Sequence, residues 1–542
     1  MKLQRILLCI SALFWIGTST AQNIPTTQKS INIRQITADF NKVKGPKSEV
    51  FNNCTSAGRA VEGLRAEWQR QLQEAVNDIG FKYIRFHGLL GDEMAVYTVN
   101  DKGEEVYNFQ YVDMLFDDLL KIGIKPFVEF CFMPDALKST DKLGHWYKCN
   151  VSPPKDMEKW GKLVEKLTRH LMERYGEEEV KTWYFEVWNE PNHPYYFDGD
   201  NRMAVFFEMY RVSALAVKSV NKDFLVGGPA TAGSAWIKEI LDYCQANNTP
   251  IDFISTHAYG GGGIGISDNT GGVGKILSRL NVDPDVIAKG VTKTRGVIDQ
   301  TAYKNMELHY TEWNSTWAVN DPIFNTYQNA AYCLNTLKQT ETSASSMAYW
   351  TFTDIFEEDG PAPKSFGQGF GLMNLQGIKK PTYLAFKFLN MLGKTELVNP
   401  DKNSWVCKDE KGNLTMLTFN YSHHVYEKDE NNQGYFGKLV PDKLIGKQII
   451  EVKNVPDGNY FLEEYRIGYR SNDIYSAYID MGKPDYLTPV QVESLKKIGS
   501  GEPFNRNVIS VSNNIVKLEK EQYENEIRFY KLVRLAEKQS NN

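Results

Sequence analysis

The chain has 542 residues, 42% of them hydrophobic, and a formal net charge of −5 at pH 7. This length is too great for one small core, so we expect two or three domains. The composition is globular and the sequence contains no basic cluster, which argues against nucleic acid as a partner.

The N-terminus has the pattern of an export signal. Lys2 and Arg5 precede an apolar stretch over 6–16 and a run of small residues that ends at Ala21. We therefore predict a signal peptide over 1–21 and export to the periplasm or the extracellular space. No later stretch of the sequence is long and apolar enough to span a bilayer.

Between residues 50 and 393, short apolar strands alternate with amphipathic helices. Several strands are nearly continuous apolar runs, as expected for strands covered on both faces. The predicted strands span 50–54, 83–87, 125–130, 183–188, 224–228, 253–257, 307–312 and 347–352. The predicted helices lie near 64–79, 112–122, 160–171, 202–220, 234–246, 285–299, 325–339 and 381–392. Eight such units predict an α/β fold, a (β/α)8 TIM barrel over 50–393.

After residue 393 the pattern changes to short strands separated by turn signals. Gly412 and Gly458 lie in two of these turns, and the strand-like runs span 414–421, 460–465, 508–511 and 526–533. This pattern predicts an accessory β-sandwich over 394–542. In the N-terminal segment 22–49, residues 31–36 alternate as well, which makes them candidates for a further strand of the sandwich.

The cysteines show no metal-binding pattern. None of them forms a CxxC pair or a Cys/His group with zinc spacing. An exported chain permits disulfides, but a core of this size needs none, so we expect most of the six cysteines after Cys9 to be buried free thiols.

Two carboxylates occupy similar positions at the ends of predicted buried strands. The fourth strand runs into Asn189 and Glu190, and Pro191 cannot continue a central strand. Glu312 ends the seventh strand in the same way. In a barrel, functional side chains lie at the C-terminal ends of the strands. A pair of carboxylates there is what hydrolysis of a glycosidic bond requires.

Other strand ends carry polar or aromatic side chains that should converge on the same mouth. They are Arg85 and His87 on the second strand, Glu129 on the third, His257 and Tyr259 on the sixth, and Trp350 on the eighth. We expect Arg85 to stabilise the barrel interior, and Glu129 and Glu186 receive no role from the sequence.

These motifs resemble those of glycoside hydrolase family 39, the family of β-xylosidases and α-L-iduronidases. The combination of Trp-Asn-Glu-Pro-Asn over 188–192 with Arg-Phe-His-Gly over 85–88 is specific. Further matching stretches are 58–60, 62–65, 123–129, 256–259, 311–314, 349–358, 465–467 and 481–484. The resemblance therefore extends through most of the chain.

The resemblance implies that Glu190 is the general acid/base and Glu312 the nucleophile of a retaining hydrolase. We expect Asn189 to hydrogen-bond the sugar 2-hydroxyl. The remaining substrate contacts are expected from His87, His257, Tyr259, Trp350 and one of the neighbours Glu357 and Glu358. Tyr259 is also expected to orient Glu312, and Trp350 to offer a face to the sugar ring. No metal or organic cofactor is implied.

The sequence thus predicts a secreted, retaining exo-glycosidase, most similar to a β-D-xylosidase. An α-L-iduronidase-like activity, another sugar such as arabinose, galactose or glucose, and an inactive carbohydrate-binding protein are the alternatives. The oligomeric state stays open. The glycine-rich stretch 260–265 follows a strand without opening a clear helix, so we expect a flexible loop beside the mouth rather than a phosphate cradle.

Overall fold

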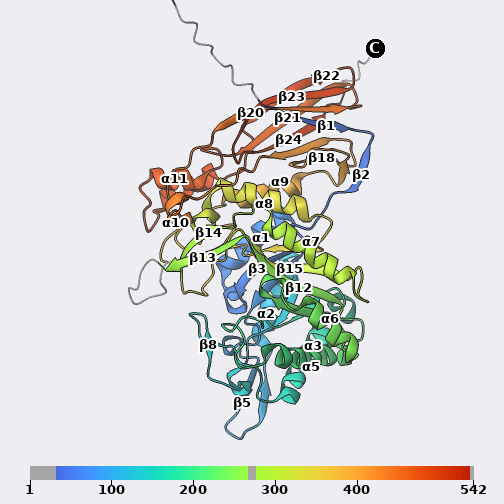
Figure 1. Ribbon diagram of the computed structural model, residues 1–542, viewed down its shortest axis with the longest axis vertical. Helices are drawn as coiled ribbons and strands as arrows, with labels where there is room; N and C mark the ends of the chain where they lie inside the picture. The colour runs from blue at the N-terminus through green and yellow to red at the C-terminus, as the bar shows by residue number, and fades with distance from the viewer. Residues whose placement is uncertain (1–31, 267–275, 537–542) are drawn as a thin grey trace, which may run out of the picture.

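The computed structural model describes residues 32–266 and 276–536 (Figure 1). The predicted leader over 1–21 lies outside these residues. A closed barrel surrounded by helices forms one end of the molecule, and the C-terminal strands form two sheets at the other end. Helices α8 and α9 lie between these two parts (Figure 1).

The barrel has eight parallel strands, which confirms the predicted fold class. In order around the barrel these are β3 (Cys54–Arg59), β4 (Tyr83–His87), β7 (Lys125–Phe130), β10 (Tyr184–Val187), β11 (Leu225–Thr231), β12 (Phe253–Tyr259), β15 (Glu307–Asn314) and β16 (Ser346–Tyr349). The prediction for the first strand, 50–54, was wrong. Val50 and Phe51 are buried in a turn, and the small, polar run that follows them forms the strand.

Helices follow the strands and cover the outside of the barrel. They are α1 (Ala66–Ile79), α2 (Gln110–Ile122), α3 (Met157–Tyr175), α4 (Glu177–Val180), α5 (Arg202–Val220), α6 (Ile237–Ala246), α7 (Val286–Asp299), α8 (Tyr327–Thr340) and α9 (Pro381–Met391). Local chemistry fixes several ends. Asp156 accepts hydrogen bonds from the first backbone N–H groups of α3, and Gly123 closes α2 at a φ of 93°.

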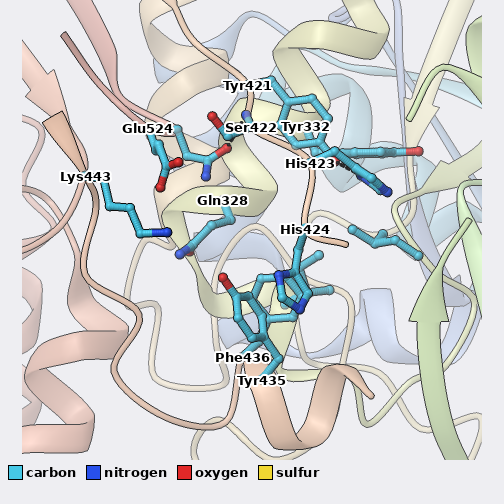
Figure 2. Close-up of a pocket in the computed structure, with 13 residues that line it drawn as sticks. Gln328, Tyr332, Tyr421, Ser422, His423, His424, Tyr435, Phe436, Lys443 and Glu524 are labelled. Atoms are coloured by element: carbon cyan, nitrogen blue, oxygen red, sulfur yellow. Dashed lines mark hydrogen bonds between the residues drawn. The ribbon is translucent and has the colours of Figure 1, made fainter. Parts of the chain in front are cut away.

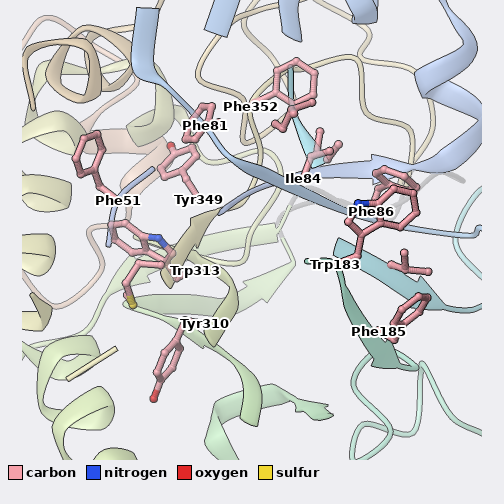
Figure 3. Packing of buried hydrophobic residues seen from close by; sticks show 14 of the residues in the cluster. Phe51, Phe81, Ile84, Phe86, Trp183, Phe185, Tyr310, Trp313, Tyr349 and Phe352 are labelled. Atoms are coloured by element: carbon pink, nitrogen blue, oxygen red, sulfur yellow. The ribbon is translucent and has the colours of Figure 1, made fainter. Parts of the chain in front are cut away.

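Aromatic side chains fill the barrel wall and its floor. Figure 3 shows large rings such as Phe86, Trp183 and Trp313 in the main buried cluster. Inside the barrel, the rings of Phe127 and Tyr184 stack with centroids 4.9 Å apart, and Phe253 meets Phe127 edge-on at 5.4 Å. This apolar layer fills part of the barrel interior, below the mouth on which the strand-end side chains converge.

Two sheets form the C-terminal part, which agrees with the predicted sandwich. The larger sheet contains β2 (Val43–Pro46), β17 (Thr395–Leu397), β18 (Ser404–Lys408), β19 (Leu414–Phe419), β24 (Ile527–Arg534), β21 (Gly458–Ile467) and β22 (Asn505–Val511). The smaller contains β1 (Ile33–Asp39), β20 (Leu444–Lys453) and β23 (Ile515–Tyr523). The sequence prediction missed β20 and β23, in which buried positions alternate with more exposed ones. Three short helices were missed as well: α10 (Asn432–Tyr435), α11 (Ile474–Asp480) and α12 (Pro489–Ile498).

Short elements decorate the loops of the barrel. Three two-stranded hairpins pair β5 (Tyr97–Val99) with β6 (Glu105–Tyr107), β8 (Leu143–Gly144) with β9 (Cys149–Asn150), and β13 (Gly261–Ile266) with β14 (Ile276–Leu280). The 3-10 helices are η1 (Ala60–Leu64), η2 (Asp92–Met94), η3 (Asp135–Leu137), η4 (Ala232–Ser234) and η5 (Pro322–Asn325). Across the described part of the chain, no helix has the length and apolar character needed to cross a membrane.

The expectation of a flexible glycine loop needs correction, because 261–266 forms β13. Its glycines allow close packing. A Cβ atom on Gly262 would lie 2.1 Å from the Trp317 indole, and one on Gly263 would lie 2.8 Å from it. The cysteine expectation agrees with the structure, because the six described cysteines are free and five are buried.

Candidate active site

A sharp backbone turn places Glu190 at the barrel mouth. Strand β10 ends at Val187, and both Trp188 and Glu190 have positive φ angles, 66° and 44°. Left-handed backbone is unfavourable for residues with a side chain and is often found at functional sites. The Glu190 N–H donates to the Ala230 carbonyl at 2.8 Å, which fixes the turn against the neighbouring strand.

The structure brings Glu190, His257 and Glu312 into one cluster. One oxygen of each carboxyl group and one ring nitrogen of His257 all lie within 4.8 Å of one another. His257 Nδ1 is 2.8 Å from Glu190 Oε1 and 3.5 Å from Glu312 Oε2. The side chains of Glu190 and Glu312 keep only 12% and 6% of their surface exposed. Two residues 122 positions apart therefore share one small, enclosed space.

Glu312 accepts two strong hydrogen bonds. Arg85 Nη1 donates to Oε1 at 2.6 Å, and the Tyr259 hydroxyl donates to Oε2 at 2.8 Å. Both contacts stabilise the ionised form of this carboxyl group. Tyr259 therefore orients Glu312, and Arg85 places a positive charge directly beside it.

Arg85 is the centre of the polar network below the site. Its side chain is fully buried and contacts Glu186 at 2.8 Å, Glu129 at 2.5 Å and the Asn189 amide oxygen at 2.9 Å, in addition to Glu312. One guanidinium thus holds three carboxylates and the amide that precedes the acid/base candidate. A buried arginine with these partners has its pKa raised by their negative charges, against the effect of burial.

The two central carboxyl groups differ in what stabilises their charge. Burial raises the pKa of Glu190 to about 7, against weaker opposing effects of His193 and Arg85. Burial also raises the pKa of Glu312, but Arg85 and Tyr259 bond to it directly. Two carboxyl groups this close retain one proton between them. The hydrogen bonds assign the charge to Glu312 and the proton to Glu190.

Both histidines are held neutral by their surroundings. Burial lowers the pKa of His257 to about 4, and it lowers that of His87 well below its usual value. His87 Nδ1 lies 3.1 Å from Glu129, while its Nε2 lies 3.4 Å from Glu358 and 3.5 Å from Glu312. Glu129 therefore orients the ring so that Nε2 faces the site.

The side chains of the neighbours Glu357 and Glu358 have different partners in the structure. Arg65 binds Glu357 through two hydrogen bonds of 2.7 and 2.9 Å, and Arg59 contacts it at 2.9 Å. Glu358 instead faces His87, so it is the member of the pair that joins the site.

An aromatic side chain packs beside His87. The Trp350 ring lies next to the His87 ring with centroids 5.0 Å apart, and only 2% of Trp350 is exposed. All the residues proposed from the sequence except Glu357 therefore lie together at the barrel mouth.

Among the residues that the structure describes, two groups of side chains have the donor atoms for a metal ion, Glu190–His257–Glu312 and His87–Glu129–Cys131. In each group Arg85 contacts a carboxylate, at 2.6 Å for Glu312 and 2.5 Å for Glu129. A guanidinium at that distance occupies an acceptor and repels a cation. The contacts therefore favour charge balance by Arg85 over a bound metal.

Comparison with known proteins agrees with this geometry. The family model of glycosyl hydrolases family 39 matches residues 34–513. This chain belongs to that family. It is 36% identical to a beta-xylosidase of Caldicellulosiruptor saccharolyticus over 475 residues, which cover 86% of this chain and 91% of the relative. A beta-xylosidase of Geobacillus stearothermophilus is 35% identical over 449 residues, covering 82% of this chain and 84% of the relative.

A solved structure of a relative has the same fold. The monomeric beta-xylosidase from Caulobacter crescentus CB15 matches with a TM-score of 0.88 and 35% identity, covering 93% of this chain and all of that one. This family 39 member is therefore a glycoside hydrolase. The alternative of an inactive carbohydrate-binding protein has no support from the site, which retains both carboxylates and their partners.

Sequence reasoning did not give the full role of several residues of this family 39 site. Arg85 was expected to stabilise the interior, and in addition it bonds Glu312 directly. Glu129 and Glu186 were unassigned, and His145, 3.9 Å from Glu358, was not considered. A charged residue inside an otherwise apolar strand was the available signal for Glu129 and Glu186, because such a charge must be paired when buried.

We expect Arg85→Met to lower both stability and activity. The change leaves Glu129, Glu186 and Glu312 buried without their common cation, which costs about 3–5 kcal/mol of folding free energy. It also raises the pKa of Glu312, so the acid limb of the pH–activity profile moves to higher pH. Thermal unfolding and pH profiles measure these effects. Arg169→Met, which breaks an exposed helical pair with Glu165, is the control and should leave both unchanged.

Proposed function

We propose that the protein is an exported, retaining β-D-xylosidase that removes single xylose residues from the ends of xylo-oligosaccharides. The relatives with 35–36% identity are beta-xylosidases, which supports xylose as the sugar. The enclosure of Glu190 and Glu312 supports release of a terminal sugar, because an internal unit would need an open groove. Export is supported by the leader pattern of residues 1–21.

The charges around the site favour a neutral sugar over a uronate. An iduronidase-like activity requires a cation free to pair with the substrate carboxylate. Arg85 is held by three glutamates, and Arg59 and Arg65 both bind Glu357. Glu358 adds an acidic side chain beside His87. A uronate would therefore meet acidic neighbours, whereas the hydroxyl groups of xylose can be hydrogen-bonded.

The proposal of retention is carried by the separation of the two carboxyl groups. Retaining enzymes hold them roughly 5–5.5 Å apart, and inverting enzymes hold them roughly 6.5–9.5 Å apart to admit a water. Oxygens of Glu190 and Glu312 lie within 4.8 Å of each other, which supports direct attack by Glu312.

In the first step, a Glu312 oxygen bonds to the anomeric carbon as the bond to the leaving oxygen breaks, and Glu190 gives its proton to that oxygen. Esterification removes the charge of Glu312, so the reason for Glu190 to hold a proton weakens. Glu190 then takes a proton from water, whose oxygen attacks the anomeric carbon and releases Glu312. Asn189, held by Arg85, is placed next to Glu190 to bond the 2-hydroxyl.

The pH dependence follows from the same pair. We expect kcat/KM to decline as pH rises through about 7, because Glu190 must be protonated and its pKa is about 7. It also declines as pH falls through the raised pKa of Glu312, which must be ionised. Both limbs describe the coupled pair. Steady-state rates across a buffer series measure them, and a rate that stays constant through neutral and alkaline pH would contradict the assignment of Glu190.

A panel of aryl glycosides tests the proposed sugar. The β-D-xyloside should be cleaved fastest among xylose, arabinose, galactose, glucose and iduronic acid derivatives. NMR of the first product should show the β-anomer, since two displacements restore the configuration. Release of the α-anomer first would disprove retention, and a faster reaction with another glycoside would disprove the xylosidase proposal.

A further inference from the structure

A second pocket lies away from the active site, between the barrel and the C-terminal part. Its volume is about 120 Å³, well above the roughly 10–15 Å³ that one water requires. Gln328 and Tyr332 of helix α8 form one wall, and Tyr421, Tyr435 and Glu524 belong to the C-terminal part. None of its lining residues belongs to the cluster around Glu190 and Glu312.

Gln328 is the residue that points to a ligand. It is 93% buried, since only 7% of its surface is exposed, and its side-chain amide forms no hydrogen bond with the described residues. Figure 2 shows it projecting from α8 between Lys443, Glu524 and the ring of Tyr435. The amide atoms of Gln328 are open to the pocket rather than sealed from it, so a polar ligand group that enters the pocket can hydrogen-bond them.

The walls combine aromatic faces with hydrogen-bonding groups. The rings of His424 and Tyr435 are stacked, with centroids 3.5 Å apart, and Phe436 lies beside Tyr435. Apolar C–H faces of a sugar ring pack on aromatic rings of this kind, while amide and carboxylate groups bind its hydroxyls. The carboxylate of Glu524 and the amide of Gln328 lie in the same pocket for this purpose.

The two permanently charged side chains of the lining balance each other. Lys443 and Glu524 have opposite charges and lie on adjacent chain segments, joined by a backbone hydrogen bond of 3.0 Å. Burial lowers the pKa of His423, so its ring is neutral at pH 7. A pocket without net charge favours a neutral ligand over an anion or a cation.

We infer that this interdomain pocket is a second, non-catalytic binding site for a neutral pyranose sugar. The identity of that sugar as D-xylose, the product of the reaction, rests on the proposed function. The ring of the sugar packs against the aromatic wall of the pocket, and its hydroxyls bond the Gln328 amide and the Glu524 carboxylate.

The pocket is connected to the active site only indirectly, through Gly260 and Tyr259. A Cβ atom on Gly260 would lie 1.8 Å from the Tyr332 hydroxyl, so this pocket residue directly supports Gly260. Gly260 follows Tyr259, which donates a hydrogen bond to Glu312. Tyr332 thus lines the pocket and also packs against the residue that follows strand β12.

Equilibrium dialysis of the full-length protein with radiolabelled D-xylose tests the inference. The native protein should bind one more sugar per chain at saturation than Gln328→Leu, which keeps the size of the side chain and removes its hydrogen bonds. Gln339→Leu, an exposed position on the same helix, is the matched control and should bind as the native protein does. If Gln328→Leu does not fold, Tyr435→Ala should show the same loss of one bound sugar.

Equal numbers of bound sugars in the native protein and in the folded pocket variants would overturn the inference. Gln328→Leu should retain the native kcat on an aryl xyloside, because Gln328 does not touch the catalytic cluster. This result is distinguishable from failure of the proposed function. If no aryl xyloside is hydrolysed but Gln328→Leu still loses one bound sugar, the proposed function fails and the second site stands.

Discussion

Glu312→Ala should reduce turnover of every glycoside by at least about 10⁴-fold, while the protein stays folded. Without this carboxylate, nothing attacks the anomeric carbon from within the site, because Glu190 holds its proton at the pH where the enzyme works. The loss should be independent of the leaving group, since bond formation to Glu312 is missing for all of them. Stopped and steady-state assays on a series of aryl xylosides measure it.

Small anions provide a sharper version of this experiment. The alanine leaves a space beside Arg85 and Tyr259, which bind the carboxylate in the native protein. Azide in that space should attack the anomeric carbon of an activated xyloside, expel the phenolate and form the α-xylosyl azide. Glu239→Ala, an exposed carboxylate on α6, is the control and should lose no activity. Substantial residual turnover in Glu312→Ala without azide would contradict its role as the nucleophile.

The positions of the two carboxylates near strand ends could be predicted from the sequence. Glu190 follows the end of β10, Glu312 lies two residues before the end of β15, and the barrel rule places both at one mouth. The role of Arg85 could not be predicted in this way. Its contacts to Glu129, Glu186 and Glu312 cross the barrel interior, and the pairing depends on the tilt and register of strands that are distant in sequence.

Sequence analysis also cannot distinguish the roles of adjacent residues in a loop. Glu357 and Glu358 have the same chemistry and neighbouring positions, so periodicity cannot separate them. Their orientations depend on Arg59 and Arg65, which bind Glu357 although they are distant from it in the sequence. The same applies to strand β20, whose buried face includes Gln448 and whose other face mixes isoleucine with charged residues, so its alternation is weak in the sequence. Tertiary contacts determine these orientations and strand boundaries, and the local sequence pattern gives no information about such contacts.

Glu190→Ala should damage poor leaving groups far more than activated ones. Protonation of the leaving oxygen contributes roughly 10²–10⁴-fold when the departing alkoxide is basic, as in xylobiose, and little when a nitrophenolate leaves unaided. Xylobiose hydrolysis should therefore decrease by about 10³-fold or more, whereas the first step with an activated aryl xyloside should persist. The second step also slows, because water has lost its base, so a burst of phenol should precede a slow steady state.

The pH profile of the Glu190→Ala variant shows whether Glu190 is the group that titrates on the alkaline side. With the activated substrate, the alkaline limb near pH 7 should disappear, since it reports the proton of Glu190. Azide should accelerate the second step, because it attacks the glycosyl–enzyme without needing a base, and the product should be the β-xylosyl azide. Glu190→Gln retains the size and hydrogen bonding of the side chain and should behave like the alanine variant. Equal losses on xylobiose and on the activated xyloside would mean that Glu190 orients the substrate and does not move the proton.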